Sequence, residues 1–259
     1  MSKNQEKESE KESEKESENK QVYIGKQTIM RLLKDIKQVK MGDLEENGIY
    51  YEHGGEEQDM MFGKAMIVGP SNTPYENGFY FFELRYPADY PHSPPILKFC
   101  TQDGETRFNP NLYKNGKVCV SILNTWRGEQ WSGCQSISSI LLTICSLLNN
   151  EPLLNEPGIY KSHPDYEPYY KIIMYKNIEV AIMNSLESSY INKQFSEFVD
   201  KMNELVIQNK NNILDMIKTM KEAKIHGLIS TQIYGMKTTI NYSQLEKNFK
   251  KIINKIEDK

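Results

Sequence analysis

Apolar residues recur with a helical period between residues 25 and 41. They are spaced three or four positions apart, which puts them on one stripe of a helix: Ile29, Leu32, Leu33, Ile36 and Val39. The opposite side carries cations, at Lys26, Arg31, Lys34 and Lys37. The sequence therefore predicts an amphipathic N-terminal helix. Its basic face is either simply solvated or a docking face for an acidic partner.

The pattern changes to that of β-strands between residues 48 and 101. Four short runs are rich in aromatic and β-branched residues, at 49–51, 60–68, 79–86 and 96–100. Turn sequences such as Gly54-Gly55 and Glu76-Asn77-Gly78 separate them. Connections this short favour neighbouring antiparallel strands. We therefore expect a four-stranded antiparallel meander.

The second half of the chain is predicted to be a long loop followed by helices. Residues 102–131 lack periodicity, and long irregular loops in compact domains are usually functional or mobile. Ser132 and Gln135 have capping-box spacing before a central helix with an apolar stripe from Ile137 to Leu148. Beyond Pro157 the periodicity favours helices near 169–180, 195–217 and 245–256. This predicts an all-helical tail that packs on the core or on another protein.

The predicted organisation has three parts and an α+β fold. Residues 1–20 repeat Glu-Lys-Glu-Ser and contain too little apolar surface to offset chain entropy, so we expect a disordered charged tail. A core domain follows at residues 21–185. Residues 186–259 form the helical C-terminal extension.

Composition narrows the class of protein. A net charge of −3 over 259 residues argues against a strongly basic nucleic-acid binder. The longest apolar run, at 137–148, is too short to cross a bilayer, and the first thirty residues do not resemble a signal peptide. Four cysteines and four scattered histidines suggest neither a disulfide framework nor a zinc site. We expect an intracellular, cytoplasmic protein, with the nucleus as an alternative, and no nucleic-acid or membrane partner.

Cys119 is the candidate nucleophile. It lies in an irregular polar loop, eight residues after Asn111, where a large partner could reach it. An ordinary thiol is already a few per cent thiolate at neutral pH, so acyl chemistry on sulfur needs no adjacent histidine base. It does need a donor to the oxyanion, which a fixed asparagine amide can supply. On spacing alone, an exposed cysteine near a turn-forming asparagine remains the alternative. Cys100 and Cys145 belong to apolar segments and are expected to be inert.

Three ordered motifs lie between residues 26 and 157. The first is Gly69-Pro70-x-x-Thr73-Pro74-Tyr75-x-x-Gly78. The second is Tyr86-Pro87-x-Asp89-Tyr90-Pro91-x-x-Pro94-Pro95. The third is Asn109-Pro110-Asn111 followed by Gly116-Lys117-Val118-Cys119. Together they resemble the motifs of ubiquitin-conjugating enzymes, and the third is similar to that family's His-Pro-Asn element and active-site cysteine. The resemblance is closest to the large Z-type branch. Asn109 in place of histidine, the insertion 124–128 (Asn-Thr-Trp-Arg-Gly), the sequence at 155–158 and, more weakly, the tail segment 241–245 suggest that branch.

The resemblance implies a ubiquitin-conjugating (UBC) core domain and a transferase activity. Cys119 would accept ubiquitin, or a ubiquitin-like modifier, as a thioester from an activating enzyme and pass it to a substrate lysine, usually with a ligase. Asn111 would stabilise the oxyanion or orient the loop. Either Asn155 or Glu156 would assist the attacking lysine, unless both are structural. No cofactor is implied, because ATP would be consumed by the activating enzyme.

The same resemblance places the partners. The basic face of the first helix would meet the activating enzyme, and the loops 91–95 and 132–134 would meet a ligase. Several positions depart from the common pattern. Asn109 weakens the usual argument for loop support, whereas His92 and Gly133 put ordinary ligase contacts in doubt. Trp126 and Trp131 either pack the active-site loop down or contact ubiquitin or substrate.

Other functions have weaker support in the sequence. An inactive scaffold of the same fold would typically lack the cysteine that this chain keeps. A cysteine hydrolase needs a histidine base, yet no histidine lies within sixteen residues of Cys119 in the sequence. A redox sensor would need a resolving cysteine, and none is obviously placed.

Overall fold

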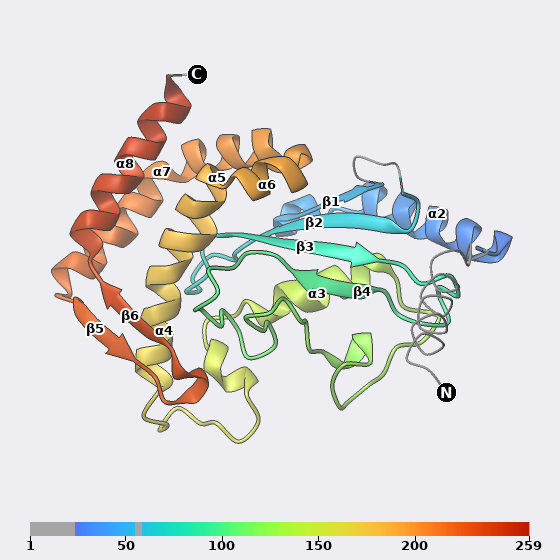
Figure 1. Ribbon diagram of the computed structural model, residues 1–259, viewed down its shortest axis with the longest axis horizontal. Coiled ribbons are helices and arrows are strands. Elements are labelled where there is room, and N and C mark those ends of the chain that lie inside the picture. Colours follow the sequence, from blue (N-terminus) through green and yellow to red (C-terminus); the bar gives the residue numbers. More distant parts are fainter. Residues whose placement is uncertain (1–23, 55–58, 259) are drawn as a thin grey trace, which may run out of the picture.

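The computed structural model describes residues 24–54 and 59–258 (Figure 1). The predicted disordered tail at 1–20 lies outside these described residues. The fold is α+β, as predicted: one four-stranded sheet with helices on both faces, and a small hairpin at the end farthest from the first helix. The boundary expected between residues 185 and 186 stays a prediction.

The main sheet is the predicted antiparallel meander. Its strands lie in sequence order, β1 (Ile49–His53), β2 (Phe62–Val68), β3 (Phe79–Arg85) and β4 (Ile96–Phe99). The two central strands are buried along almost their whole length, whereas β4 alternates between buried and exposed positions. A strand covered on both faces needs apolar residues at consecutive positions. This explains the run Phe79-Tyr80-Phe81-Phe82.

One face of the sheet forms the core with the helices of the predicted UBC region. These are α2 (Lys26–Met41), α3 (Ile137–Leu147) and α4 (Tyr166–Lys176). Leu32 and Val39 of α2 and Ile140, Leu141 and Ile144 of α3 pack in this core. Leu33, which the periodicity placed on the same stripe, is 52% exposed. The stripe of α2 that meets the sheet is therefore narrower than predicted.

The other face of the sheet is covered by the C-terminal part of the chain. It consists of η4 (Asn177–Asn184, π-helical), α5 (Ser185–Glu187), α6 (Ser189–Gln194), η5 (Ser196–Phe198), α7 (Val199–Glu222) and α8 (Tyr242–Glu257). Met66, Phe79 and Phe81 of the sheet belong to the same hydrophobic cluster as Phe195 and Phe198. The buried ammonium of Lys64 also pairs with Glu197 at 2.8 Å. The tail therefore completes a second core.

Two details of the predicted helices are wrong. The tail is not all-helical, because β5 (Gly227–Ser230) and β6 (Lys237–Ile240) form an antiparallel hairpin. Four-residue strands are too short to give a clear period of two. The central helix starts at Ile137, where Ser136 and Ser139 form the capping box, rather than after Ser132. The Gln135 side chain does accept from the Ser132 amide, but in the loop before the helix. The last helix is capped by Asn241, whose side chain accepts from the Gln244 amide at 3.0 Å.

Replacing Phe195 by alanine should destabilise the whole chain. The ring is completely buried, and its centroid lies 4.8 Å from that of Phe81 on the sheet. Removing a buried phenylalanine side chain usually costs about 3–5 kcal/mol of unfolding free energy. Urea unfolding of the full chain measures this loss. Leu228→Ala, at a side chain that is 70% exposed, should change the free energy by less than about 0.5 kcal/mol. Equal stability of the two variants would contradict a shared core.

Candidate functional site

The segment 109–119 folds back on itself and brings Asn111 beside Cys119. Isolated bridges join Leu112 to Val118 and Lys98 to Lys117, and the Cys119 amide donates to the Asn111 carbonyl at 2.9 Å. The two predicted residues border one cavity of about 150 Å³. Its lining consists of Arg107, Pro110, Asn111, Tyr113, Cys119, Trp126, Asn155, Glu156, Pro157 and Tyr234. All four predicted site residues therefore meet at one place.

The Cys119 thiol is more enclosed than the sequence suggested. The residue is only 3% exposed, and its Sγ donates to the Thr125 carbonyl at 2.9 Å. Thr125 belongs to the insertion 124–128, and its Oγ1 is bonded to the backbone on either side of the cysteine, at Val118 and Val120. We expected a thiol that a large partner could reach, and in this conformation the thiol is enclosed. The insertion folds against the sulfur, and Cys119 borders the small cavity.

The Asn111 carboxamide contacts Cys119 through the backbone. Its Nδ2 donates to the Cys119 carbonyl at 2.7 Å. Its Oδ1 is buried and accepts no hydrogen bond from the described residues. In this conformation the donor is used by the main chain, so Asn111 holds the loop that carries the thiol.

Asn109 performs the supporting role that its replacement of histidine had put in doubt. The side chain is completely buried, and its Nδ2 donates to the Tyr75 hydroxyl at 3.1 Å and to the Leu147 carbonyl at 2.8 Å. Its Oδ1 accepts from the Asn111 amide at 3.0 Å. One carboxamide thus ties the loop to α3 and to the body of the fold. The prediction of weakened loop support is corrected.

Asn155 and Glu156 lie together, but their side chains have different surroundings. The Asn155 Nδ2 donates to the Leu147 carbonyl at 3.1 Å and to Asn109 Oδ1 at 3.4 Å. Its amide is therefore engaged in holding the loop. The Glu156 carboxylate accepts a hydrogen bond from the Tyr234 hydroxyl. The structure therefore distinguishes Asn155 from Glu156, whereas the sequence could not show which of them would assist the lysine.

Tyr234 is a site residue that the sequence analysis missed. It comes from η6 (Ile233–Gly235), the turn between β5 and β6. Its ring lies 4.1 Å from the Arg107 guanidinium carbon, which is itself 3.7 Å from the Tyr113 ring. Such stacking of arginine between aromatic rings is attractive and rigid. The turn Tyr234-Gly235 was the available sign, but a turn gives no indication of what it approaches.

A model of the ubiquitin-conjugating enzyme family matches residues 31–177, more than half of the chain. The chain belongs to the ubiquitin-conjugating enzyme family. Among its relatives, Ubiquitin-conjugating enzyme E2 Z of Danio rerio is 46% identical over 154 residues, which cover 55% of this chain and 47% of that protein. The Homo sapiens protein of the same name is 45% identical over 154 residues, with 55% and 44% covered. The Homo sapiens Dual E2 ubiquitin-conjugating enzyme/E3 ubiquitin-protein ligase BIRC6 is 46% identical over 113 residues, 41% of this chain and 2% of that protein. The matches thus span less than half of each relative.

Two loops that the family resemblance assigned to a ligase lie next to each other in this member of the family. The Trp131 indole donates to the Pro91 carbonyl at 2.8 Å, so Trp131 packs the loop, whereas Trp126 is 44% exposed.

The basic face predicted for α2 is only partly open. The guanidinium of Arg31 donates to the carbonyls of Gly133 and Gln135 and pairs with Asp35. Arg31 therefore joins α2 to this loop rather than contributing to an open basic face. Lys26, Lys34 and Lys37 are exposed.

The cysteines differ in exposure, and two of them have a raised pKa. Burial raises the pKa of the Cys100 thiol to about 12 and also raises the pKa of Cys145. Both are partly rather than fully buried, and Cys134 is exposed. The expectation that Cys100 and Cys145 are unreactive fits their raised pKa values, because alkylation requires the thiolate.

Alkylation by iodoacetamide at pH 8 should label Cys134 first. Cys119 should react slowly because it is 3% exposed, and Cys100 should react slowly because about one thiol in ten thousand is ionised four units below its pKa. Raising the pH toward 10 should increase the labelling of Cys100 in proportion to its thiolate. Mass spectrometry of the peptides over time measures the order. Labelling of Cys119 before Cys134 would contradict the enclosed thiol.

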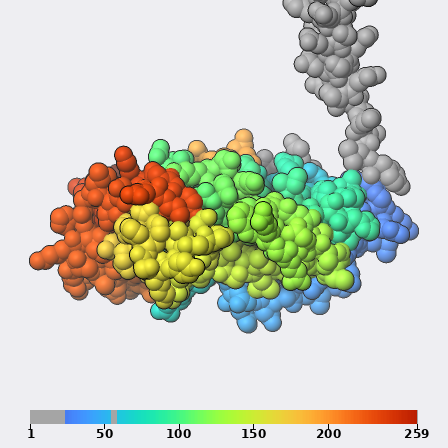
Figure 2. All heavy atoms as spheres, turned by 90° about the horizontal axis from the view of Figure 1, so that it is seen from below, coloured from blue at the N-terminus to red at the C-terminus, as the bar shows by residue number. Residues whose placement is uncertain are grey.

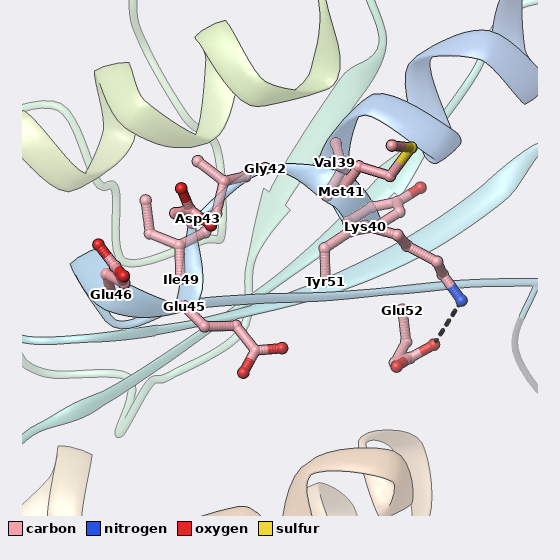
Figure 3. A pocket seen from close by; sticks show the side chains of 11 residues that line it. Val39, Lys40, Met41, Gly42, Asp43, Glu45, Glu46, Ile49, Tyr51 and Glu52 are labelled. Atoms are coloured by element: carbon pink, nitrogen blue, oxygen red, sulfur yellow. Dashed lines mark ion pairs between the residues drawn. The ribbon is translucent and has the colours of Figure 1, made fainter.

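Another cavity, of about 450 Å³, lies where α2 ends and η1 (Glu45–Asn47) leads into β1 (Figure 3). Lys40 reaches across it to Glu52 at 3.6 Å, and Asp43, Glu45 and Glu46 add carboxylates. None of the residues that line this cavity is a cysteine.

Within residues 24–54 and 59–258, no group of three or more His, Cys, Asp and Glu side chains is placed to hold a metal ion. Over the same residues, every helix is too short or too polar to cross a bilayer.

Proposed function

We propose that this chain carries ubiquitin, or a ubiquitin-like modifier, as a thioester on Cys119 and transfers it to a lysine of a protein substrate. The observation that supports this most directly is the shared cavity of Cys119, Asn111 and Glu156. It combines a thiol and an amide donor, at the spacing of the family motif, with a carboxylate. A carrier of this kind takes the modifier from an activating enzyme, which consumes the ATP.

The proposed transfer has two acyl steps. In the first, the Cys119 thiolate attacks the modifier's C-terminal carbonyl carbon, which the activating enzyme holds as its own thioester. A C–S bond forms, and the thiolate of the activating enzyme leaves. In the second, a neutral lysine amine attacks the new thioester, a C–N bond forms, and the Cys119 thiolate leaves. The lysine arrives as an ammonium ion, so one proton passes to water before the attack and a second passes to water after the C–N bond has formed.

Both steps require local opening around the sulfur. The Thr125 carbonyl accepts the Sγ hydrogen bond, so the insertion 124–128 has to move before the modifier's C-terminus reaches Cys119. Residues 124–130 are exposed, so little buried surface opposes this movement. Trp126 lines both the Cys119 cavity and an adjoining open groove with Arg127, Gln130 and Pro157. We assign this groove to the extended C-terminus of the modifier.

Glu156 is the better candidate for assisting the lysine. A lysine amine has a pKa near 10.4, so it reaches the site mostly as an ammonium ion. A carboxylate at the cavity can orient this cation and favour its approach, whereas the Asn155 amide is already bonded to Leu147. We propose Asn111 as the residue that fixes the loop in the resting chain and donates to the oxyanion after the carbonyl of Cys119 moves.

The partner surfaces follow from the same arrangement. The exposed lysines of α2, Lys26, Lys34 and Lys37, would meet an acidic face of the activating enzyme. The adjoining loops 91–95 and 132–134 would meet a ligase. The substrate would present its lysine at the mouth of the cavity next to Glu156. These processes belong to the cytoplasm or the nucleus, where we place the protein.

A charging assay tests the proposal. The full chain is mixed with activating enzyme, ubiquitin and ATP, and the products are separated without reductant. We expect an adduct one ubiquitin larger than the chain, which disappears when a thiol reductant is added. Cys134→Ala removes the exposed thiol and should leave the adduct intact. An adduct that forms without ATP, or that resists the reductant, would overturn the proposal; so would the absence of any adduct with the activating enzymes for ubiquitin and its relatives.

A further inference from the structure

The tail hairpin reaches the candidate site from a distant part of the sequence. Figure 2 shows its red-orange atoms against the yellow segment that follows α3, on the face where this segment meets the active-site loop. The contact is specific at the atomic level. The Tyr234 hydroxyl donates to Glu156, and the Lys114 Nζ donates to the Tyr234 carbonyl at 3.3 Å. The core and the tail therefore build one site together.

The turn of the hairpin is held firmly in place. The buried carboxylate of Asp165, at the start of α4, accepts from the amides of Gln232 at 3.0 Å and Ile233 at 2.8 Å. On the other side of the turn, the buried Met236 sulfur accepts from the Arg107 amide at 3.3 Å. Tyr234 has a φ of 61°, a left-handed conformation that non-glycine residues rarely adopt. Surrounding contacts must maintain such a conformation, which is most common at functional sites.

The Tyr234 side chain has two separate contacts. Its ring stacks on the Arg107 guanidinium, and its centroid lies 6.1 Å from that of the Tyr169 ring. These two contacts fix the plane of the Tyr234 ring. Its hydroxyl is then aimed at one oxygen of the Glu156 carboxylate. Burial, together with the nearby Glu156 charge, raises the pKa of Tyr234, so the hydroxyl remains a donor throughout the working pH range. Among the described residues, no other side chain donates a hydrogen bond to this carboxylate.

We propose that Tyr234 is a positioning residue for transfer to lysine. It holds one oxygen of Glu156, so that the other oxygen faces the mouth of the cavity and receives the ammonium group of the acceptor. This inference rests on the proposed function, because it concerns the second acyl step of that reaction. It assigns the tail a direct part in selecting a cationic acceptor, in addition to its packing role.

The test measures the discharge of a preformed thioester in single-turnover reactions. Tyr234→Phe keeps the ring that stacks on Arg107 and removes only the hydroxyl. We expect charging by the activating enzyme to stay within about twofold, and discharge to free lysine to fall about tenfold, because a hydrogen bond to a charged group is lost. Discharge to hydroxylamine, an amine that is uncharged at neutral pH, should stay within about twofold. A variant that merely loosened the thioester pocket would slow both acceptors.

Two further variants complete the design. Tyr242→Phe removes the hydroxyl of another tail tyrosine, one that is 3% exposed as a residue and makes no side-chain hydrogen bond to the described residues, and it should behave as the wild type. Glu156→Gln should reproduce the lysine defect, and adding Tyr234→Phe to it should cause little additional loss, since both act on one interaction. Equal lysine discharge by Tyr234→Phe and the wild type would overturn the inference, as would an equal loss with hydroxylamine. In either case normal charging would leave the proposed function standing, whereas failure of the wild type to charge would defeat both.

Discussion

Replacing Cys119 by alanine should abolish the thiol-sensitive ubiquitin adduct. The variant lacks the sulfur atom on which the proposed thioester forms, so no residual reaction is expected at this position. The fold should survive, because the change removes one buried atom beside a cavity that already exists. Gel electrophoresis without reductant measures the adduct, and circular dichroism confirms that the variant is folded.

Cys119→Ser provides a sharper form of the same experiment. A serine hydroxyl can form an oxygen ester, which a thiol reagent does not cleave by exchange and which should therefore persist in the treated sample. Cys134→Ala is the matched control for the loss of a thiol, since Cys134 is exposed and lies outside the cavity. An adduct that persists in Cys119→Ala and disappears in Cys134→Ala would show that the nucleophile has been misassigned.

Replacing Asn111 by alanine should slow discharge to lysine by about a hundred- to a thousandfold. Removal of a single oxyanion donor has an effect of this size in other acyl-transfer enzymes. Asn111 also donates to the Cys119 carbonyl at 2.7 Å, so a second effect on the loop is expected. Measuring charging and discharge separately distinguishes the two roles, because a displaced loop impairs both steps while a lost oxyanion donor mainly impairs the second.

Asn115→Ala is the control for this variant. Asn115 is exposed in the same loop, and its side chain accepts a hydrogen bond from the Lys117 amide at 3.1 Å. The substitution Asn115→Ala therefore removes a carboxamide of the same size without changing the lining of the Cys119 cavity. We expect discharge rates within about threefold of the wild type, since surface changes of this kind have small effects. If Asn111→Ala discharged as fast as Asn115→Ala, neither role proposed for Asn111 would hold.

The sequence was most informative where local pattern and burial agree. The runs at 49–51 and 79–86 became strands because aromatic and β-branched residues fill both faces of a covered sheet. The meeting of Asn111 and Cys119 was expected from the resemblance of residues 109–119 to the family motif. The enclosure of the thiol was not, because it depends on the Thr125 carbonyl reaching Cys119 Sγ. Loop conformations of this kind are determined by tertiary contacts rather than by propensity.

Asn109 and Tyr234 show two different limits of sequence reasoning. Comparison with the common motif suggested a loss at Asn109, yet a buried carboxamide with donors and an acceptor can support the loop as a histidine ring would. Tyr234 was invisible for another reason. It lies 78 residues from Glu156 in the chain, so only the folded hairpin brings its hydroxyl to that carboxylate.

The coverage of the sheet by the tail has a practical consequence for anyone who shortens this protein. A fragment that ended with the family-matched region at residue 177 would expose Met66, Phe79 and Phe81 to water. Large bare apolar surfaces promote self-association. Expression of that fragment should give aggregates, and loss of activity in it would reflect insolubility rather than a missing partner-binding module. Deletion studies should therefore begin with point changes at the hairpin turn.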